Sequence, residues 1–202
     1  MVTEVNILKN QKHIGIFSGS FNPIHLGHVN IVKHIIDIQL VDEVWFVVSP
    51  CNPLKSQTEL IDEYLRLDMV MFAIQNVPHV KASDIEFTMP IPSYSIDTLH
   101  EFSRQYPDFQ FSLIIGSDNA FVFEQWKDYQ EILKNYSILV YPRKGFEFES
   151  VKTLYPQMQL VASPLFDISS TQIREYIAHK KDVSSWLHPA VLQYIDENDL
   201  YQ

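Results

Sequence analysis

Two histidines near the start of the chain follow a turn that contains small residues. His25 and His28 stand three residues apart, shortly after Gly19 and Ser20. The backbone N–H groups of such a turn can approach a phosphate closely, and imidazoles at a helix start favour the arrival of an anion. Phosphoryl or nucleotidyl transfer needs this arrangement, because the protein there positions the nucleophile and stabilises charge on the phosphate. We therefore predict that His25 and His28 are catalytic.

The histidine pair has two other interpretations. A His-x-x-His pair is a weak metal-binding pattern, and no third ligand stands nearby in the sequence. Either histidine alone could also be an ordinary surface or core side chain. The turn that precedes them favours phosphate chemistry, so we predict no metal ligated directly by the protein.

A second cluster of phosphate-binding residue types stands near the other end of the chain. Ser169, Ser170 and Thr171 open a predicted helix, and Arg174 follows one turn later. Hydroxyl groups, free backbone donors and an arginine at a helix start together suit a phosphate. The alternative is plain helix capping, with Arg174 in solvent.

The elements that must position these residues alternate along the chain. Apolar runs rich in β-branched and aromatic residues predict strands at 13–17, 43–48, 109–115, 136–141 and 158–161. Stretches of helical length lie between and after them, at 23–38, 59–75, 94–106, 125–134, 171–178 and 189–197. The first of these helices is predicted to begin with Asn22 as its N-cap and Pro23 as its first residue. Residues 77–92 are the least regular part, and we expect a loop with short strands there.

Alternation of strands and helices is typical of a parallel sheet covered by helices on both faces. We therefore predict an α/β fold: a single Rossmann-like, doubly wound domain spanning residues 1–202, with a mainly parallel sheet of about five strands. Ligands of such sheets bind beyond the carboxyl ends of the strands. The first strand-to-helix turn, which carries His25 and His28, lies at that edge.

Composition excludes several classes of protein. The chain has 202 residues, of which 46% are hydrophobic and 20% charged, and one cysteine, Cys51, which cannot form an intrachain disulfide. Neither a secretory signal nor a long apolar segment is evident, so we expect a cytoplasmic protein that does not bind membranes. Its 25 acidic and 15 basic residues give a formal net charge of −10, which argues against nucleic-acid binding.

The motif at residues 19–28 resembles the nucleotidyltransferase form of the His-x-Gly-His motif, which class I aminoacyl-tRNA synthetases share. The resemblance implies that His25 and His28 contact the triphosphate of ATP and stabilise its α-phosphorus. It also implies that ATP is bound by the first turn and by the second cluster, namely Gly19, Ser20, Phe21, Ser169, Ser170, Thr171 and Arg174. Usual members have Gly-Gly-Thr-Phe-Asp-Pro where this chain has Ser18, Ser20 and Asn22. These changes keep a hydroxyl and a capping residue.

Four stretches in the middle of the chain are similar to bacterial nicotinate-nucleotide adenylyltransferases. They cover residues 92–99, 115–119, 126–132 and 141–145, and the resemblance as a whole extends from about residue 13 to residue 178. It implies transfer of AMP from ATP to nicotinic acid mononucleotide, with Mg²⁺ accompanying ATP. The substrate contacts that it implies are Lys55, Tyr94, Ser95, Gly116, Asp118, Trp126 and Arg143.

Within this set, Tyr94, Ser95 and Trp126 would hold the nicotinate ring and its carboxylate. A pyridinium ring stacks well on an indole, although Trp126 could instead be a core aromatic. At the positions of Pro53 to Lys55 the family often has Pro-His-Lys, whereas this chain has Leu54 in the histidine's place. Lys55 could therefore equally be a solvated loop lysine.

Three alternatives to this function remain. A sister enzyme would adenylylate phosphopantetheine or nicotinamide mononucleotide, and a nucleotide-binding sensor would bind ATP without turnover. A tRNA-charging enzyme is disfavoured by the short, acidic chain. The sequence does not indicate an oligomeric state.

Overall fold

The sheet of this protein is parallel throughout. A computed structural model describes residues 11–51 and 60–202, so the predicted contact Lys55 lies outside the described part of the chain. Six strands pair in the order β3-β2-β1-β4-β5-β6. Their bounds are β1 Lys12–Gly19, β2 Glu43–Val48, β3 Val80–Ser83, β4 Phe109–Gly116, β5 Ser137–Tyr141 and β6 Gln159–Leu160. The predicted doubly wound α/β fold is confirmed, with a sixth, short strand, β3, within residues 77–92, where we expected a loop with short strands.

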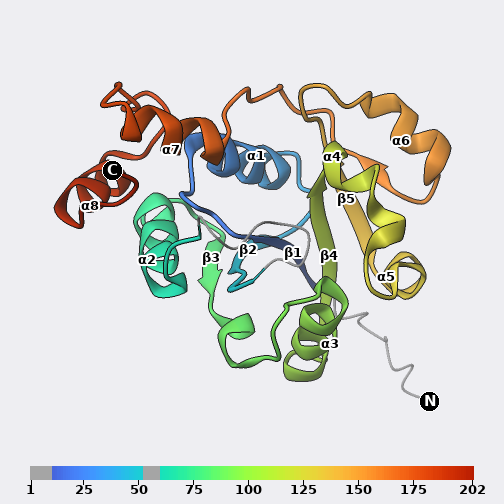
Figure 1. Ribbon diagram of the computed structural model, residues 1–202. Helices are drawn as coiled ribbons and strands as arrows, with labels where there is room; N and C mark the ends of the chain where they lie inside the picture. The colour runs from blue at the N-terminus through green and yellow to red at the C-terminus, as the bar shows by residue number, and fades with distance from the viewer. Residues whose placement is uncertain (1–10, 52–59) are drawn as a thin grey trace, which may run out of the picture.

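Helices cover both faces of this sheet (Figure 1). They are α1 Leu26–Asp37, α2 Glu63–Ile74, α3 Ser95–Gln105, α4 Ser117–Ala120, α5 Tyr129–Asn135, α6 Phe148–Leu154, α7 Ser170–Ala178 and α8 Pro189–Glu197, with 3₁₀ turns at Ile85–Thr88 and Phe123–Gln125. The short helix α6 was not predicted, whereas the bounds of α8 match the prediction. No helix in the described part of the chain is long and apolar enough to cross a membrane.

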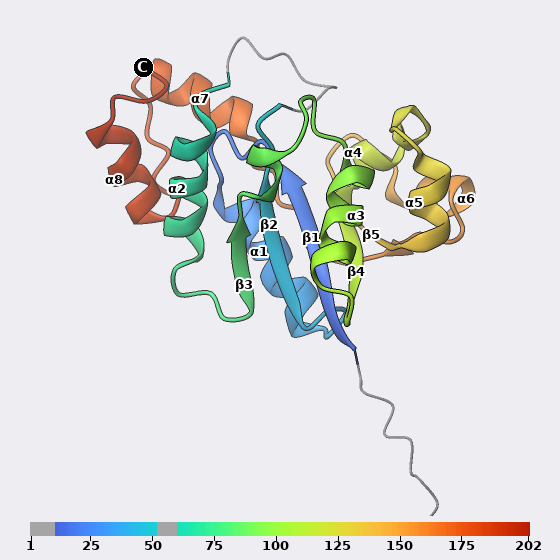
Figure 2. The same cartoon turned by 90° about the horizontal axis from the view of Figure 1, so that it is seen from below.

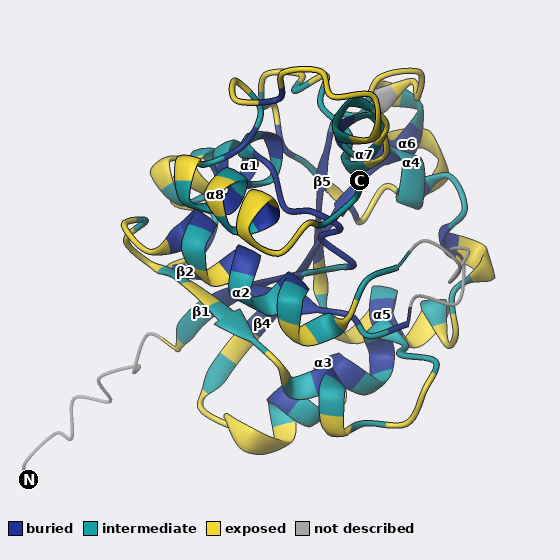
Figure 3. Ribbon diagram, turned by 60° about the vertical axis from the view of Figure 1, so that its left-hand side comes forward, coloured by how far each residue is buried: buried dark blue, intermediate teal, exposed yellow. Residues whose placement is uncertain are grey.

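Side-chain alternation in the strands divides the core into two layers. In β2, Val44, Phe46 and Val48 pack with α1, α2 and α8, while Trp45 and Val47 pack with α3 on the other face. All six residues of β2 are buried, as expected for a parallel strand covered on both sides. Figure 3 shows buried strands at the centre and exposed outer faces on the helices.

The strand order reverses between β1 and β4. From β1 the chain proceeds outward through β2 to β3, then returns and proceeds the other way through β4, β5 and β6. In an open parallel sheet, the crevice at such a switch point lies at the carboxyl ends of the two strands. Here those ends are Gly19 of β1 and Gly116 of β4.

The start of α1 differs from the prediction. The helix begins at Leu26, with His25 as its N-cap, instead of beginning after Asn22 at Pro23. Residues 22–24 are held by the distant α7 segment, because the backbone carbonyls of Asn22 and Pro23 accept hydrogen bonds from Arg174 and Ser170. These long-range contacts outweigh the local capping preference.

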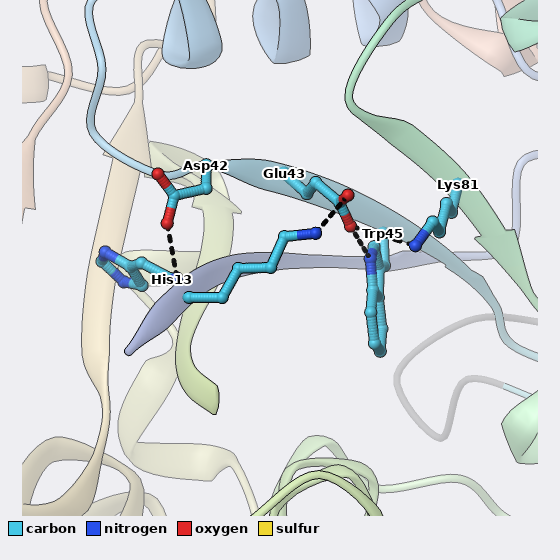
Figure 4. Close-up of polar contacts among 6 residues, drawn as sticks. His13, Asp42, Glu43, Trp45 and Lys81 are labelled. Atoms are coloured by element: carbon cyan, nitrogen blue, oxygen red, sulfur yellow. Dashed lines mark hydrogen bonds and ion pairs between the residues drawn. The ribbon is translucent and has the colours of Figure 1, made fainter. Parts of the chain in front are cut away.

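An ion-pair cluster closes the opposite, amino-terminal end of the sheet (Figure 4). Glu43 accepts hydrogen bonds from Lys12 Nζ at 2.5 Å and from Trp45 Nε1 at 3.0 Å, and Lys81 Nζ lies 3.2 Å away. Burial alone would raise the pKa of Glu43, but these three donors lower it to about 2. The cluster therefore ties β1, β2 and β3 together through one ionised carboxylate.

This cluster predicts an acid-dependent loss of stability. The folded-state pKa of Glu43 is depressed, so its contribution is complete above about pH 5 and disappears as the pH falls towards 2. Glu43→Gln should lower the free energy of unfolding by about 1 to 2 kcal/mol at pH 7, because the two lysines are partly solvated. The difference from wild type should vanish near pH 2 in urea titrations. Glu197→Gln, at an exposed acid, is the control, and a pH-independent difference for Glu43→Gln would contradict the assignment.

Candidate active site

A cavity of about 450 Å³ opens at the switch point of the sheet. Its walls come from the turn after β1, the ends of β4 and β5, the starts of α3 and α7, and the segment around Trp126. Volumes of this order accommodate small-molecule ligands. Fourteen of the predicted contacts line it: Gly19, Ser20, Phe21, His25, His28, Ser95, Gly116, Asp118, Trp126, Arg143, Ser169, Ser170, Thr171 and Arg174.

The two histidines form a stacked pair in the cavity wall. Their ring centroids are 3.7 Å apart with an interplanar angle of 26°. The backbone N–H of His25 donates to Nδ1 of His28 at 3.3 Å, which leaves the proton of a neutral His28 on Nε2. The N-cap position of His25 and the first-turn position of His28 thus give the pair a fixed mutual orientation.

Burial keeps His25 neutral near neutral pH. Its side chain is buried, and burial together with the smaller effect of the Arg143 charge lowers its pKa to about 3. An arriving polyphosphate would oppose both effects by adding negative charge. Gly27 permits the arrangement, since a Cβ at that position would lie 2.9 Å from Nδ1 of His25. The ring of His25 therefore occupies the space beside Gly27.

The start of α7 is fastened to the histidine turn. Ser169 caps α7 by accepting from the N–H of Gln172, and the Ser170 hydroxyl donates to the carbonyl of Pro23 at 2.9 Å. Arg174 Nη1 donates to the carbonyl of Asn22 at 2.9 Å. Ser169 therefore caps α7 and Ser170 fastens it to the turn after β1, and both residues line the cavity.

The other side of the cavity carries an ion pair. Arg143 Nε lies 3.7 Å from Oδ2 of Asp118. Both side chains crowd Gly116, where an added Cβ would lie 2.7 Å from Cγ of Arg143 and would also clash with Asp118. Only glycine at position 116 lets this pair sit over the end of β4.

Tyr94 is not among the described residues that line the cavity. It is the N-cap of α3, and its ring faces the ammonium group of Lys127, whose Nζ lies 5.0 Å from the ring centroid. The neighbouring Ser95 does line the cavity, as the first residue of α3. The backbone N–H groups at such a helix start have no intrahelical partners and favour a negatively charged group.

Sequence reasoning missed Glu86, a buried carboxyl group in the cavity wall. Glu86 is 1% exposed and accepts hydrogen bonds from Thr98 at 2.8 Å and Ser18 at 3.1 Å. Burial raises its pKa, and the hydroxyl donors oppose this in part. Polar and apolar residues alternate from Ile85 to Thr88, and this pattern predicts that the side chain of Glu86 is exposed. The sequence therefore did not indicate a buried carboxyl group at this position.

Unsatisfied polar atoms concentrate in this cavity. In the described part of the chain, five buried side-chain atoms have no hydrogen-bond partner, and all five residues line the cavity: His25 Nδ1, Glu86 Oε2, Ser93 Oγ, Asp118 Oδ1 and Trp126 Nε1. A buried polar atom without a partner costs about 1 to 3 kcal/mol. The set includes both donors and acceptors, so it suits a ligand that carries hydroxyl groups as well as anionic oxygens.

The fold and this site define a nucleotidyltransferase. A doubly wound parallel sheet, a histidine pair at the first turn and a second helix start across the same crevice are brought together in one cavity. The chain belongs to the cytidylyltransferase-like family, whose model matches residues 16–176.

Two relatives and one solved structure show what the chain is similar to. A protein of Bacteroides fragilis named "Probable nicotinate-nucleotide adenylyltransferase" is 48% identical over 181 residues, covering 90% of each chain. A protein of the same name from Flavobacterium johnsoniae is 42% identical over 190 residues, covering 94% of this chain and 98% of its own. The solved structure of Plasmodium falciparum nicotinic acid mononucleotide adenylyltransferase complexed with NaAD has the same fold, with a TM-score of 0.82, 24% identity and coverage of 94% and 97% of the two chains.

The geometry of the histidine pair predicts a large effect on turnover. His25→Asn and His28→Asn should each lower kcat by about 10²-fold, the usual loss for one preorganised group that stabilises transition-state charge. Asparagine is polar and smaller than histidine, so it should fit the buried turn without unfolding it. His100→Asn, at an exposed histidine paired with Glu131, is the control. Turnover within about threefold of wild type in both purified variants would refute the catalytic role.

Proposed function

We propose that this protein transfers AMP from ATP to nicotinic acid mononucleotide, giving nicotinic acid adenine dinucleotide and pyrophosphate. The names of its relatives support this activity. The neighbour at 24% identity supports the fold, and the relatives at 48% and 47% identity support the activity.

The observation that carries the proposal is that one cavity joins two different sets of groups. On the α1 face of the sheet are the stacked histidines and the start of α7, which suit a triphosphate. On the α3 face are Ser95, Ser93 and Trp126, which suit a flat ring bearing a carboxylate. Figure 1 shows α1 and α7 on one side of the sheet and α3 on the other. A two-substrate transfer needs such a shared cavity, because the reacting phosphates must meet in line.

In the proposed step, a phosphate oxygen of the mononucleotide attacks the α-phosphorus of ATP. The new P–O bond forms as the bond from the α-phosphorus to the bridging oxygen breaks, and pyrophosphate leaves with that electron pair. The attacking phosphate is already ionised near neutral pH, so no protein base is required. His25, His28 and Arg174 are proposed to bind and orient the triphosphate and to stabilise its transition-state charge.

A Mg²⁺ ion is proposed to accompany ATP, and when bound it would neutralise phosphate charge. The described residues contain no group of three or more His, Cys, Asp or Glu side chains placed to hold a metal. The cavity carboxyls, Asp118 and Glu86, come from two different elements, α4 and the 3₁₀ turn Ile85–Thr88. These donors fit an ion held mainly by triphosphate oxygens and water, which is the usual preference of Mg²⁺.

A substrate panel tests the proposed function. Pyrophosphate release should require ATP, Mg²⁺ and nicotinic acid mononucleotide together, and the dinucleotide should appear in equal amount. Faster turnover with phosphopantetheine or nicotinamide mononucleotide would assign the chain to a sister activity. Binding of ATP without pyrophosphate release for any acceptor would establish a sensor instead.

The α3 side of the cavity predicts selectivity for the acid over the amide. Backbone donors at the start of α3 and the Ser95 hydroxyl would bond to both carboxylate oxygens, but would meet an NH₂ donor on nicotinamide. The unpaired group and the lost charge-assisted bond predict a preference of about 10² or more in kcat/KM for the acid.

Two variants separate ring recognition from carboxylate recognition. Trp126→Ala should reduce kcat/KM for both mononucleotides by similar factors, because stacking recognises the ring. Ser95→Ala should narrow the ratio between them. Wild-type values of kcat/KM within about threefold for the two substrates would contradict the selectivity and leave the adenylyl transfer standing.

A further inference from the structure

The side chain of Tyr201, next to the end of the chain, reaches the catalytic turn. Its hydroxyl donates to Oδ1 of Asn22 at 2.8 Å, across 179 positions of sequence. Asn22 is 5% exposed, lines the cavity and stands three residues before His25. The tyrosine therefore contacts the segment that positions the histidine pair without itself lining the cavity among the described residues.

The backbone at Tyr201 is held in an uncommon conformation. Its φ angle is +64°, and that of Asp199 is +50°, in the left-handed region that aromatic residues rarely adopt. Such conformations persist where surrounding contacts impose them. Here the ring packs against the core layer of α1 and α2, and the hydroxyl reaches Asn22. The strained turn after α8 thus directs the ring inward.

The hydroxyl is a stable hydrogen-bond donor. Burial raises the pKa of Tyr201 above its ordinary value, and the nearby charges of Arg174 and Arg66 only partly offset this. Tyr201 therefore stays protonated throughout the neutral range. Asn22 is then held at two points, by Tyr201 at its side-chain oxygen and by Arg174 at its backbone carbonyl.

We propose that Tyr201 is a positioning residue for the adenylyl transfer: its hydroxyl fixes Asn22, and through the turn of residues 22–25 it sets the position of His25 and His28. The effect on the reaction is indirect, because the hydroxyl bonds to Asn22 and not to either histidine. Small displacements of a charge-stabilising group reduce the rate of a preorganised site strongly, while substrate affinity depends on many other contacts. The proposal rests on the proposed function for its kinetic test.

A matched tyrosine in the same segment provides the control. The hydroxyl of Tyr194 in α8 also donates to a side-chain oxygen, Oδ2 of Asp68, at 2.7 Å. This contact fastens α8 to α2 and not to the histidine turn. Figure 2 shows α2 between α8 and β3, with the C-terminal segment beside them. Tyr194→Phe and Tyr201→Phe each remove one hydroxyl and keep the ring.

The full-length variants are compared by pyrophosphate release with ATP and nicotinic acid mononucleotide, well below each melting midpoint. Tyr201→Phe should lower kcat by about 5- to 20-fold and leave both KM values within about twofold. Tyr194→Phe should leave kcat unchanged, even if it lowers the melting temperature as much. Equal kcat values in the two variants would show that the Tyr201 hydroxyl only stabilises the fold, and would overturn the proposal.

A double-mutant cycle tests the route through Asn22. If Tyr201 acts on the histidines through this side chain, Asn22→Ala and the double variant Asn22→Ala/Tyr201→Phe should have kcat values within about twofold of each other. Effects that multiply would place the action of Tyr201 elsewhere and overturn the proposed route.

A measurement without turnover separates this inference from the proposed function. The ring NMR signals of His25 and His28 should shift from their wild-type positions in Tyr201→Phe and should keep those positions in Tyr194→Phe. Unshifted signals would refute positioning by Tyr201 whatever the substrate. A wild-type enzyme that is inactive with every acceptor, but whose histidine signals shift in Tyr201→Phe, would refute the proposed function alone.

Discussion

The cavity depends on one buried cation. Arg66 of α2 is fully buried, and its guanidinium donates to the carbonyls of Ser20 and Ser49, each at 2.7 Å, and to that of Ile61 at 3.0 Å. Ser20 follows β1 and Ser49 follows β2, so a single side chain fixes the two loops that border the cavity. Because a buried guanidinium without acceptors would be very costly, these loops cannot move apart without destabilising the fold.

The same edge of the sheet also explains how an acidic chain could bind anionic substrates. The whole chain carries a net charge of −10, yet its proposed substrates are anions. Arg143 and Arg174 both line the cavity, and the starts of α1, α3 and α7 contribute residues to it. Helix starts and a few guanidinium groups provide a local positive potential that does not depend on the overall charge.

Local sequence patterns predicted the architecture well and predicted less of the site. Strand and helix alternation placed the doubly wound sheet, and the motifs placed His25, Ser95 and Arg174 on one cavity. The predicted start of α1 was wrong because Asn22 and Pro23 accept hydrogen bonds from residues about 150 positions away. No local sequence pattern indicates such contacts. The resemblance implies a substrate contact for Tyr94, which stays a prediction; in the structure its ring faces Lys127.

Two missed residues illustrate different limits. Arg66 occupies the buried stripe of α2 together with Met69, Val70 and Ala73, so helical periodicity could have indicated its burial. Glu86 had no such signal. Its burial depends on hydroxyls from Ser18 and Thr98, which only the tertiary structure brings to it.

The contact between Tyr201 and Asn22 also bears on how the site comes into being. It closes a loop of 179 positions, the longest sequence separation among the side-chain hydrogen bonds described above. Contacts of such separation carry a large closure entropy and tend to form after the local elements have been built. A partly folded chain can therefore contain the sheet and α1 while the histidine turn is still unsecured. Catalytic competence then arrives with the docking of the C-terminal segment, so an incompletely folded molecule would consume little ATP.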